Sequence, residues 1–394
     1  MFGRKEIGLA LDSRECVVLS TRRRGEIEET HYPALAQVKG GEIQALGQRA
    51  YRLVGKSRDV VSVFPGRVED PKILAGYLQR VVPRGSFVRQ RLWASVPTGF
   101  GMQSLFNFRH CLEGSIRPKE TVLVPELVAA AIGCGLPVLR SEEDSYRARM
   151  VIHVGASRIS GGVFVDGGLT GLIVKETSWD HLVREVQENL QFRLGATLGF
   201  NTYFKVVRSL SRNYFERNSL RPGSAKPAPA PAPLKDVKEP TEIALPGYDE
   251  APEVAGELST PTNLRTFNER GLIEYVVEDE TVSHAIDVQL RGFLFDLEKV
   301  VFGCFARLRN DGRGEIASDL FSDRVMVVGD VFFDSSQLAQ HFARLSRFRF
   351  ETSNGNAVAR GLRRILSSTG PQKYAYRELS RTVHDDSRFL ASAV

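Results

Sequence analysis

Residues 150–168, MVIHVGASRISGGVFVDGG, constrain the fold of this chain more than any other stretch. An apolar run enters a turn of small residues at Gly155-Ala156-Ser157, and a second apolar run leads to another turn at Asp166-Gly167-Gly168. Alternating and β-branched residues bounded by glycines predict a strand, a tight turn and a strand. Such a turn is either an ordinary core hairpin or a loop whose backbone amides face an anion such as phosphate.

A weaker copy of the same pattern lies near the start of the chain, at residues 8–20 (GLALDSRECVVLS). Each copy opens one half of a chain of 394 residues, which is long enough for two hydrophobic cores. The repeat therefore favours a fold of two lobes with a cleft between them.

Predicted strands and helices alternate along the chain, so the fold class is α/β. Residues 6–21 are predicted to form a strand, a tight turn and a strand, and the apolar run at 150–152 a strand that enters the turn at Gly155. Further strands are predicted at 34–38, 92–97, 121–125, 159–165, 272–277, 281–286 and 323–331. Helices are predicted at 44–54, 70–82, 102–112, 126–134, 177–193, 201–214, 287–308, 335–345 and 354–366. Residues 369–394 are polar and carry no strong pattern.

Composition excludes several classes of protein. Hydrophobic content of 42% and charged content of 25% are typical of a soluble globular chain. The net charge of +6 is spread along the sequence, so no nucleic-acid partner is expected. The four cysteines lie far apart and lack zinc-type spacing with histidine, so neither a metal site nor a disulfide framework is predicted. The lack of a signal-peptide pattern and of a run of about 18 apolar residues predicts a cytoplasmic protein.

Residues 222–263 differ from the rest of the chain. A Pro/Ala repeat, KPAPAPAPLK, leads into an acidic stretch with few aromatic residues. Such composition cannot bury enough apolar surface to offset chain entropy, which predicts a disordered or polyproline II-like insertion within the second domain. The insertion is a candidate tether for a protein partner.

The segment VPELVAAAIGCGLPV at 124–138 resembles a conserved stretch of the MreB-type bacterial actins, members of the superfamily of actins, heat-shock chaperones and sugar kinases. Ala45-Leu46-Gly47, Ser95-Val96-Pro97 and NAVARG at 356–361 fall in the same order, so the resemblance spans nearly the whole chain. It implies an actin-like fold with two lobes, each a mixed sheet flanked by helices. Residues 1–145 with 355–394 would form the first lobe, and residues 146–354, interrupted by 222–263, the second.

In this family ATP lies between the lobes, held by two phosphate hairpins and an adenosine loop, with magnesium nearby. The nucleotide positions of this sequence fall on Asp12, Arg14, Gly155, Ser157, Arg158 and Gly329. Of the hairpin motifs only Asp12 and Gly155 are kept, while His153 replaces the aspartate on the metal side and both threonines are lost. ATP or ADP with magnesium is therefore predicted to bind weakly or not at all.

Glu126 matches the carboxylate that orients the attacking water in the family. It also fits the simpler role of an acidic residue at a helix N-terminus, favoured by the helix dipole. Arg14 or Arg158 could hold a phosphate in place of the missing amides, since arginine suits bidentate phosphate contacts. The sequence is therefore compatible with a working ATPase as well as with a degenerate one.

The resemblance also implies self-association and a membrane surface as partners. Actin-like protomers stack head to tail into filaments. The hydrophobic loop by which the family contacts the inner membrane falls on Phe87-Val88, which arginines flank; a loop that simply returns to the strand at Leu92 is the alternative. The resemblance implies a cytoplasmic scaffold protein related to rod-shape-determining MreB, peripheral to the inner membrane, with weakened or lost ATP hydrolysis. A functional MreB-like ATPase filament and a peptide-binding actin-fold adaptor are the alternatives.

Overall fold

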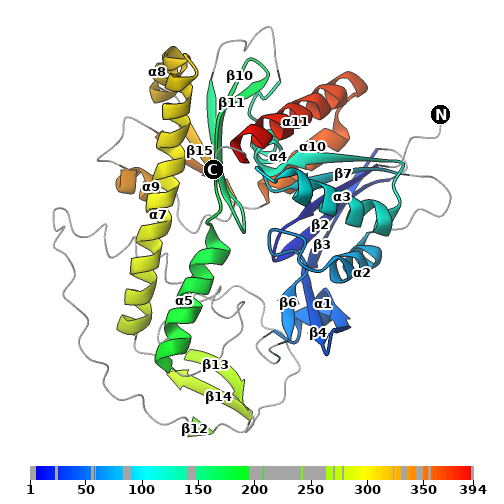
Figure 1. Ribbon diagram of the computed structural model, residues 1–394, viewed down its shortest axis with the longest axis vertical. Coiled ribbons are helices and arrows are strands. Elements are labelled where there is room, and N and C mark those ends of the chain that lie inside the picture. The colour runs from blue at the N-terminus through cyan, green and yellow to red at the C-terminus, as the bar shows by residue number, and fades with distance from the viewer. Residues whose placement is uncertain are drawn as a thin grey trace. The chain divides into compact units, whose positions relative to one another are not determined.

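The structure is a computed structural model (Figure 1). Its residues divide into two compact units. The larger comprises Met1–Arg52, Val61–Trp179 and Phe295–Val394, and the smaller comprises Leu53–Val60 and Asp180–Leu294. The residues described are 6–22, 25–54, 57, 59–82, 90–139, 148–194, 207, 241–242, 263–268, 271–276, 279–322, 324–329, 335–342, 349–353 and 356–391.

Two five-stranded sheets in the larger unit share one topology. The first has the order β3-β2-β1-β7-β8 and the second the order β11-β10-β9-β15-β16. In each, three antiparallel strands from one meander are followed by two parallel strands. The first sheet is built from β1 (Glu6–Leu11), β2 (Glu15–Thr21), β3 (Ile27–Pro33), β7 (Arg91–Val96) and β8 (Glu120–Pro125). The second is built from β9 (Arg149–Val154), β10 (Ile159–Val165), β11 (Gly168–Lys175), β15 (Arg324–Gly329) and β16 (Arg349–Ser353). The duplicated hairpin pattern of the sequence is therefore a duplicated sheet topology.

Two three-stranded sheets are smaller. One is made of β4 (Leu35–Lys39), β5 (Glu42–Leu46) and β6 (Val60–Ser62), and the other of β12 (Thr241–Glu242), β13 (Asn263–Asn268) and β14 (Gly271–Val276). The described helices are α1 (Gln48–Tyr51), α2 (Pro71–Val81), α3 (Met102–Ile116), α4 (Glu126–Gly133), α5 (Trp179–Leu194), α7 (Asp279–Asn310), α8 (Gly314–Ser322), α9 (Ser335–Phe342), α10 (Ala357–Ser367) and α11 (Gly370–Ala391).

Local signals explain where several helices begin. The Asp70 side chain accepts hydrogen bonds from the amides of Lys72 and Ile73, and Pro71 stands at the first helical position of α2. The Asn356 side chain caps α10 by accepting from the amide of Ala359. Both helices were predicted within a few residues of their observed bounds.

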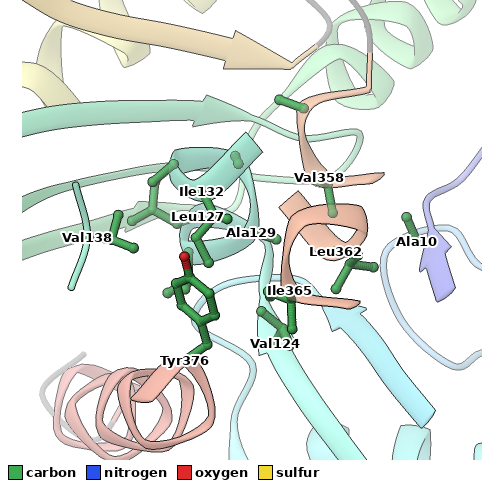
Figure 2. Close-up of a cluster of buried hydrophobic side chains, with 14 of the residues drawn as sticks. Ala10, Val124, Leu127, Ala129, Ile132, Val138, Val358, Leu362, Ile365 and Tyr376 are labelled. Atoms are coloured by element: carbon green, nitrogen blue, oxygen red, sulfur yellow. The ribbon is translucent and has the colours of Figure 1, made fainter. Parts of the chain in front are cut away.

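Helices α4 and α10 cross in the core, and α11 packs beside them (Figure 2). Every residue of α4 is buried. At the crossing, a Cβ added to Gly133 would overlap the carbonyl oxygen of Ala357, and one added to Gly361 would overlap that of Ala129. The two backbones touch because neither glycine carries a side chain.

Two predictions from the sequence are wrong, and one stretch without a predicted element forms a helix. Residues 44–54 are not one helix, because β5 runs to Leu46 and Gly47, at a φ of 57°, breaks the chain before the single turn of α1. Residues 281–286 form no strand but lie inside α7. Residues 370–391 form α11, whose buried Tyr376, Leu379 and Val383 follow helical spacing between polar residues.

Ion pairs hold α11 on the first sheet. Lys373 Nζ lies 2.6 Å from Glu6 Oε2, and Arg377 Nη1 lies 2.5 Å from Glu120 Oε1. Since both glutamates come from distant strands, this anchoring has no local signal in the sequence. The predicted helix at 201–214 lies outside the described residues apart from residue 207, and so does the insertion at 222–263 apart from 241–242 and 263. The two lobe boundaries stay a prediction.

Because the crossing is close-packed, we expect a Gly→Ala substitution to destabilise the protein at the crossing but not on an exposed helix face. Gly361→Ala must push α4 and α10 apart, so we expect the free energy of unfolding in urea to fall by about 1–3 kcal/mol. Gly114→Ala in α3 is the matched control, because nothing lies within 4 Å of the added Cβ. It should raise the free energy by roughly 0.5–1 kcal/mol through helix propensity. Equal effects of the two substitutions would contradict a close-packed crossing.

Candidate functional site

The turn between β1 and β2 is closed by Asp12. Its Oδ1 accepts hydrogen bonds from the amides of Arg14 and Glu15, both at 2.7 Å. The Asp12 amide donates to the Glu15 carbonyl at 2.9 Å, and the Arg14 carbonyl accepts from the Ala34 amide at 2.8 Å. An aspartate that bonds the backbone two and three residues on is a common way to form a tight turn. In the first hairpin the amides of Arg14 and Glu15 therefore point at the Asp12 side chain.

The turn between β9 and β10 is closed in a similar way. The Gly155 amide donates to the carbonyl of Arg158 at 2.9 Å, and Ser178 Oγ donates to the Gly155 carbonyl. A Cβ on Gly155 would lie 3.1 Å from the His153 ring and 3.2 Å from Glu126 Oε2, so the space beside the glycine is already occupied. Ser157 lies against Gly66, where an added Cβ would overlap the serine side chain.

Arg158 has three partners in the larger unit. Its Nη1 donates to the Gly99 carbonyl at 3.0 Å, its Nη2 lies 2.9 Å from Glu176 Oε1, and its guanidinium lies 5.0 Å from the centre of the Phe100 ring. Burial lowers the pKa of Arg158, and the carboxylates of Glu176 and Glu126 partly oppose that shift. The guanidinium is therefore engaged with protein groups.

Glu126 and His153 meet beneath the second turn. Glu126 is the first residue of α4, His153 lies in β9, and both are buried, with 3.7 Å between Glu126 Oε2 and His153 Nδ1. Burial raises the pKa of Glu126 to about 8, the charge of Asp12 adds to this, and Arg158 opposes it. Burial lowers the pKa of His153 to about 4. At pH 7 the pair is therefore a contact between neutral groups rather than an ion pair.

Gly329 ends β15, where it pairs with Val154 of β9. Its φ of 109° and its approach to the Val154 carbonyl leave no room for a side chain. Among the described residues, no group of three His, Cys, Asp or Glu side chains could hold a metal ion. Phe87 and Val88 lie outside the described residues.

The structure brings Glu126, Gly155, Ser157 and Arg158 together, with Asp12 near enough to influence the Glu126 carboxyl. The sequence did not predict which residues contact Gly155, Ser157 and Arg158. These contacting residues are Gly66, Gly99, Phe100, Glu176 and Ser178. Most of them come from loops distant along the chain, and no local pattern marks them. The carboxyl group beside these closed turns, that of Glu126, is neutral at pH 7. A neutral carboxyl group is a poor acceptor for a proton from water.

Solved structures of bacterial actin-like proteins match this fold over nearly the whole chain. The crystal structure of MreB5 of Spiroplasma citri bound to ADP is 14% identical, with a TM-score of 0.63, and covers 95% of this chain and 98% of its own. The same protein bound to AMPPNP is 14% identical, with a TM-score of 0.62 over 92% and 95%. The MamK double helical filament is 10% identical, with a TM-score of 0.61 over 93% and 100%. No family model and no curated protein matches the sequence.

These likenesses confirm the actin-like α/β fold and, at the level of the fold, the resemblance to MreB-type actins. Sequence identities of 10–14% support a shared fold and do not extend to a shared function. In the described part of the chain, no helix combines the length and the apolar character needed to cross a membrane.

The neutral Glu126 predicts a pH dependence of stability. Its folded pKa of about 8 lies above the ordinary 4.5, so its contribution is complete below about pH 4.5 and is lost as pH rises through 8. His153 acts with the opposite sign, but only as pH falls from 6.5 toward 4. Between pH 6.5 and 8, the unfolding free energy should therefore fall by up to about 1.4 kcal/mol per pH unit more than in Glu126→Gln.

Urea unfolding at several pH values measures this slope. The exposed Glu113 serves as the control position, and Glu113→Gln should keep the slope of the parent protein. Parallel curves for the parent and Glu126→Gln would show that Glu126 is ionised in the folded protein.

Proposed function

We propose that this chain is a bacterial actin-like cytoskeletal or scaffold protein that self-associates, with ATP hydrolysis weakened or lost. The observation that carries the proposal is the closed β9–β10 turn, in which the Gly155 amide is bonded to the Arg158 carbonyl. A phosphate-binding hairpin needs amides that point at the ligand. In the first hairpin the Asp12 side chain likewise accepts hydrogen bonds from two amides, those of Arg14 and Glu15.

The groups that would carry out hydrolysis support the same proposal. A carboxyl group positions and deprotonates a water only when it is ionised, and burial favours the protonated form of Glu126 at neutral pH. His153 stands where the family has an acidic group on the metal side, and burial keeps it uncharged. Loss of a single preorganised group typically costs on the order of a hundredfold in rate. Several losses together leave little hydrolysis.

Self-association is supported by the fold alone. A protein of the same fold, MamK, was solved as a double helical filament. Head-to-tail stacking of one protomer on the next generates filaments without any chemistry at the nucleotide position. A role in cell shape belongs to this proposal through the resemblance to MreB.

A working ATP-binding filament is the second candidate. The MreB5 structures of the same fold were solved with ADP and with AMPPNP. For this chain to bind ATP with magnesium, Arg14 or Arg158 would have to replace the amides now bonded within the turns. A peptide-binding adaptor that uses residues 222–263 is the third candidate.

Contact with the inner membrane through Phe87 and Val88 is part of the proposal. Two apolar residues between arginines can enter an anionic leaflet, with roughly 1 kcal/mol from each basic residue. A Phe87→Ser, Val88→Ser double variant should pellet less with anionic liposomes than the parent protein. Equal pelleting would remove this loop from the proposal.

Nucleotide binding separates the first two candidates. In a titration with labelled ATP and magnesium, we expect no saturable signal up to about millimolar nucleotide, because amides of both turns already have acceptors. The Arg158→Ala variant should give the same flat titration. Saturable binding by the parent that is lost in Arg158→Ala would instead support the working ATPase.

A further inference from the structure

We propose that Arg158 is a built-in strap that ties the β9–β10 turn of the second sheet to the β7–α3 loop of the first sheet, so that no ligand is needed to join the two. The strap consists of the hydrogen bond from Arg158 Nη1 to the Gly99 carbonyl at 3.0 Å and the packing of its guanidinium on Phe100. All of these residues lie in the larger unit.

The loop that receives the strap is fixed on its other sides. Thr98 Oγ1 accepts from the Leu127 amide at 3.0 Å, which anchors the loop to the first turn of α4. Gly99 adopts a φ of 83°, and an added Cβ would lie 3.0 Å from Val174 of β11. Phe100 is buried and packs on Phe64, with ring centres 6.3 Å apart. Arg158 therefore binds a loop that α4 and Phe64 hold in place and that also touches β11 of the second sheet.

The side of the second sheet is equally fixed. The Arg158 carbonyl accepts from the Gly155 amide within the turn, and Ser178, directly before α5, donates from its Oγ to the Gly155 carbonyl. Ser157, next to Arg158, lies against Gly66 from the segment between β6 and α2. The turn and the loop are thus two well-ordered pieces, and the arginine side chain crosses between them.

Arginine is suited to this task, and lysine is not. The planar guanidinium donates in several directions at once and stacks on an aromatic face, while an ammonium is a point charge. The ion pair with Glu176 contributes less, because the Glu176 side chain is 79% exposed and surface pairs are weak. The Arg158 side chain itself is 17% exposed, so its bonds to Gly99 and Phe100 carry the strap.

The inference rests on the proposed function in one respect: the turn that holds Arg158 is where the resemblance places a phosphate. A bound nucleotide would link this turn to the β1–β2 turn through its phosphates, whereas Arg158 links it to the β7–α3 loop. The link between the turn and the loop is therefore made without a nucleotide.

Hydrogen exchange of the full-length, nucleotide-free protein tests the strap. The readouts are the exchange rates of residues 97–101, where the Phe100 amide donates to the Pro97 carbonyl, and of residues 155–159, where the Gly155 amide is bonded. In Arg158→Ala we expect exchange about tenfold faster or more at both segments, although they lie far apart in sequence. Exchange at 97–101 within twofold of the parent would overturn the proposal.

Two further variants and a control sharpen the result. Arg158→Lys keeps the charge and most of the stem, so it should fold, and it should still accelerate exchange at 97–101 at least threefold. If Arg158→Ala fails to fold, Arg158→Lys carries the test, and parent-like exchange in it overturns the strap. Glu176→Ala and the surface variant Arg22→Ala should stay within twofold at 97–101. Because these measurements contain no nucleotide, a positive ATP titration would overturn the proposed function and leave the strap standing.

Discussion

The rest of the structure depends on the place where α4 and α10 touch through their backbones. Gly133 and Gly361 stand at that crossing, and any side chain there would separate the helices. Arg364 of α10 adds a hydrogen bond of 2.6 Å to the Ile132 carbonyl at the end of α4. Because α4 contacts β8 and β9, and α10 contacts β1 and β15, this one crossing connects the two repeated sheets. Because α4 begins directly after β8, its first residue, Glu126, lies in the same core.

From that position the chemistry of the site follows. Glu126 starts α4 inside the core rather than at a wet helix end, and burial there favours its neutral form. His153, which is buried beside it, takes no compensating proton. In the second turn the Gly155 amide is bonded to the Arg158 carbonyl, and in the first turn Asp12 binds the amides of Arg14 and Glu15.

Local sequence signals were enough for many of the strands and helices, while the candidate site residues stay a prediction. The apolar runs and turn residues around Gly155 predicted the central hairpin, and Asp70 and Asn356 marked two helix starts. The long polar helix α11 was missed because ion pairs to Glu6 and Glu120, distant in sequence, hold it in place. Glu126, Gly155 and Arg158 were identified through the family resemblance. Their partners Gly99 and Ser178 were not, because a carbonyl oxygen and an isolated hydroxyl leave no pattern in a sequence.

Electron microscopy of the purified protein on a lipid monolayer, with and without ATP and magnesium, tests this description of the protein most directly. If the chain's own side chains join the two β-sheets and the nucleotide position is inactive, filaments or ordered two-dimensional arrays should form on the lipid. They should form equally with and without ATP. Assembly that requires ATP, and that disassembles as ATP is consumed, would contradict it. A protein that stays monomeric in both conditions would contradict the scaffold role and favour the adaptor.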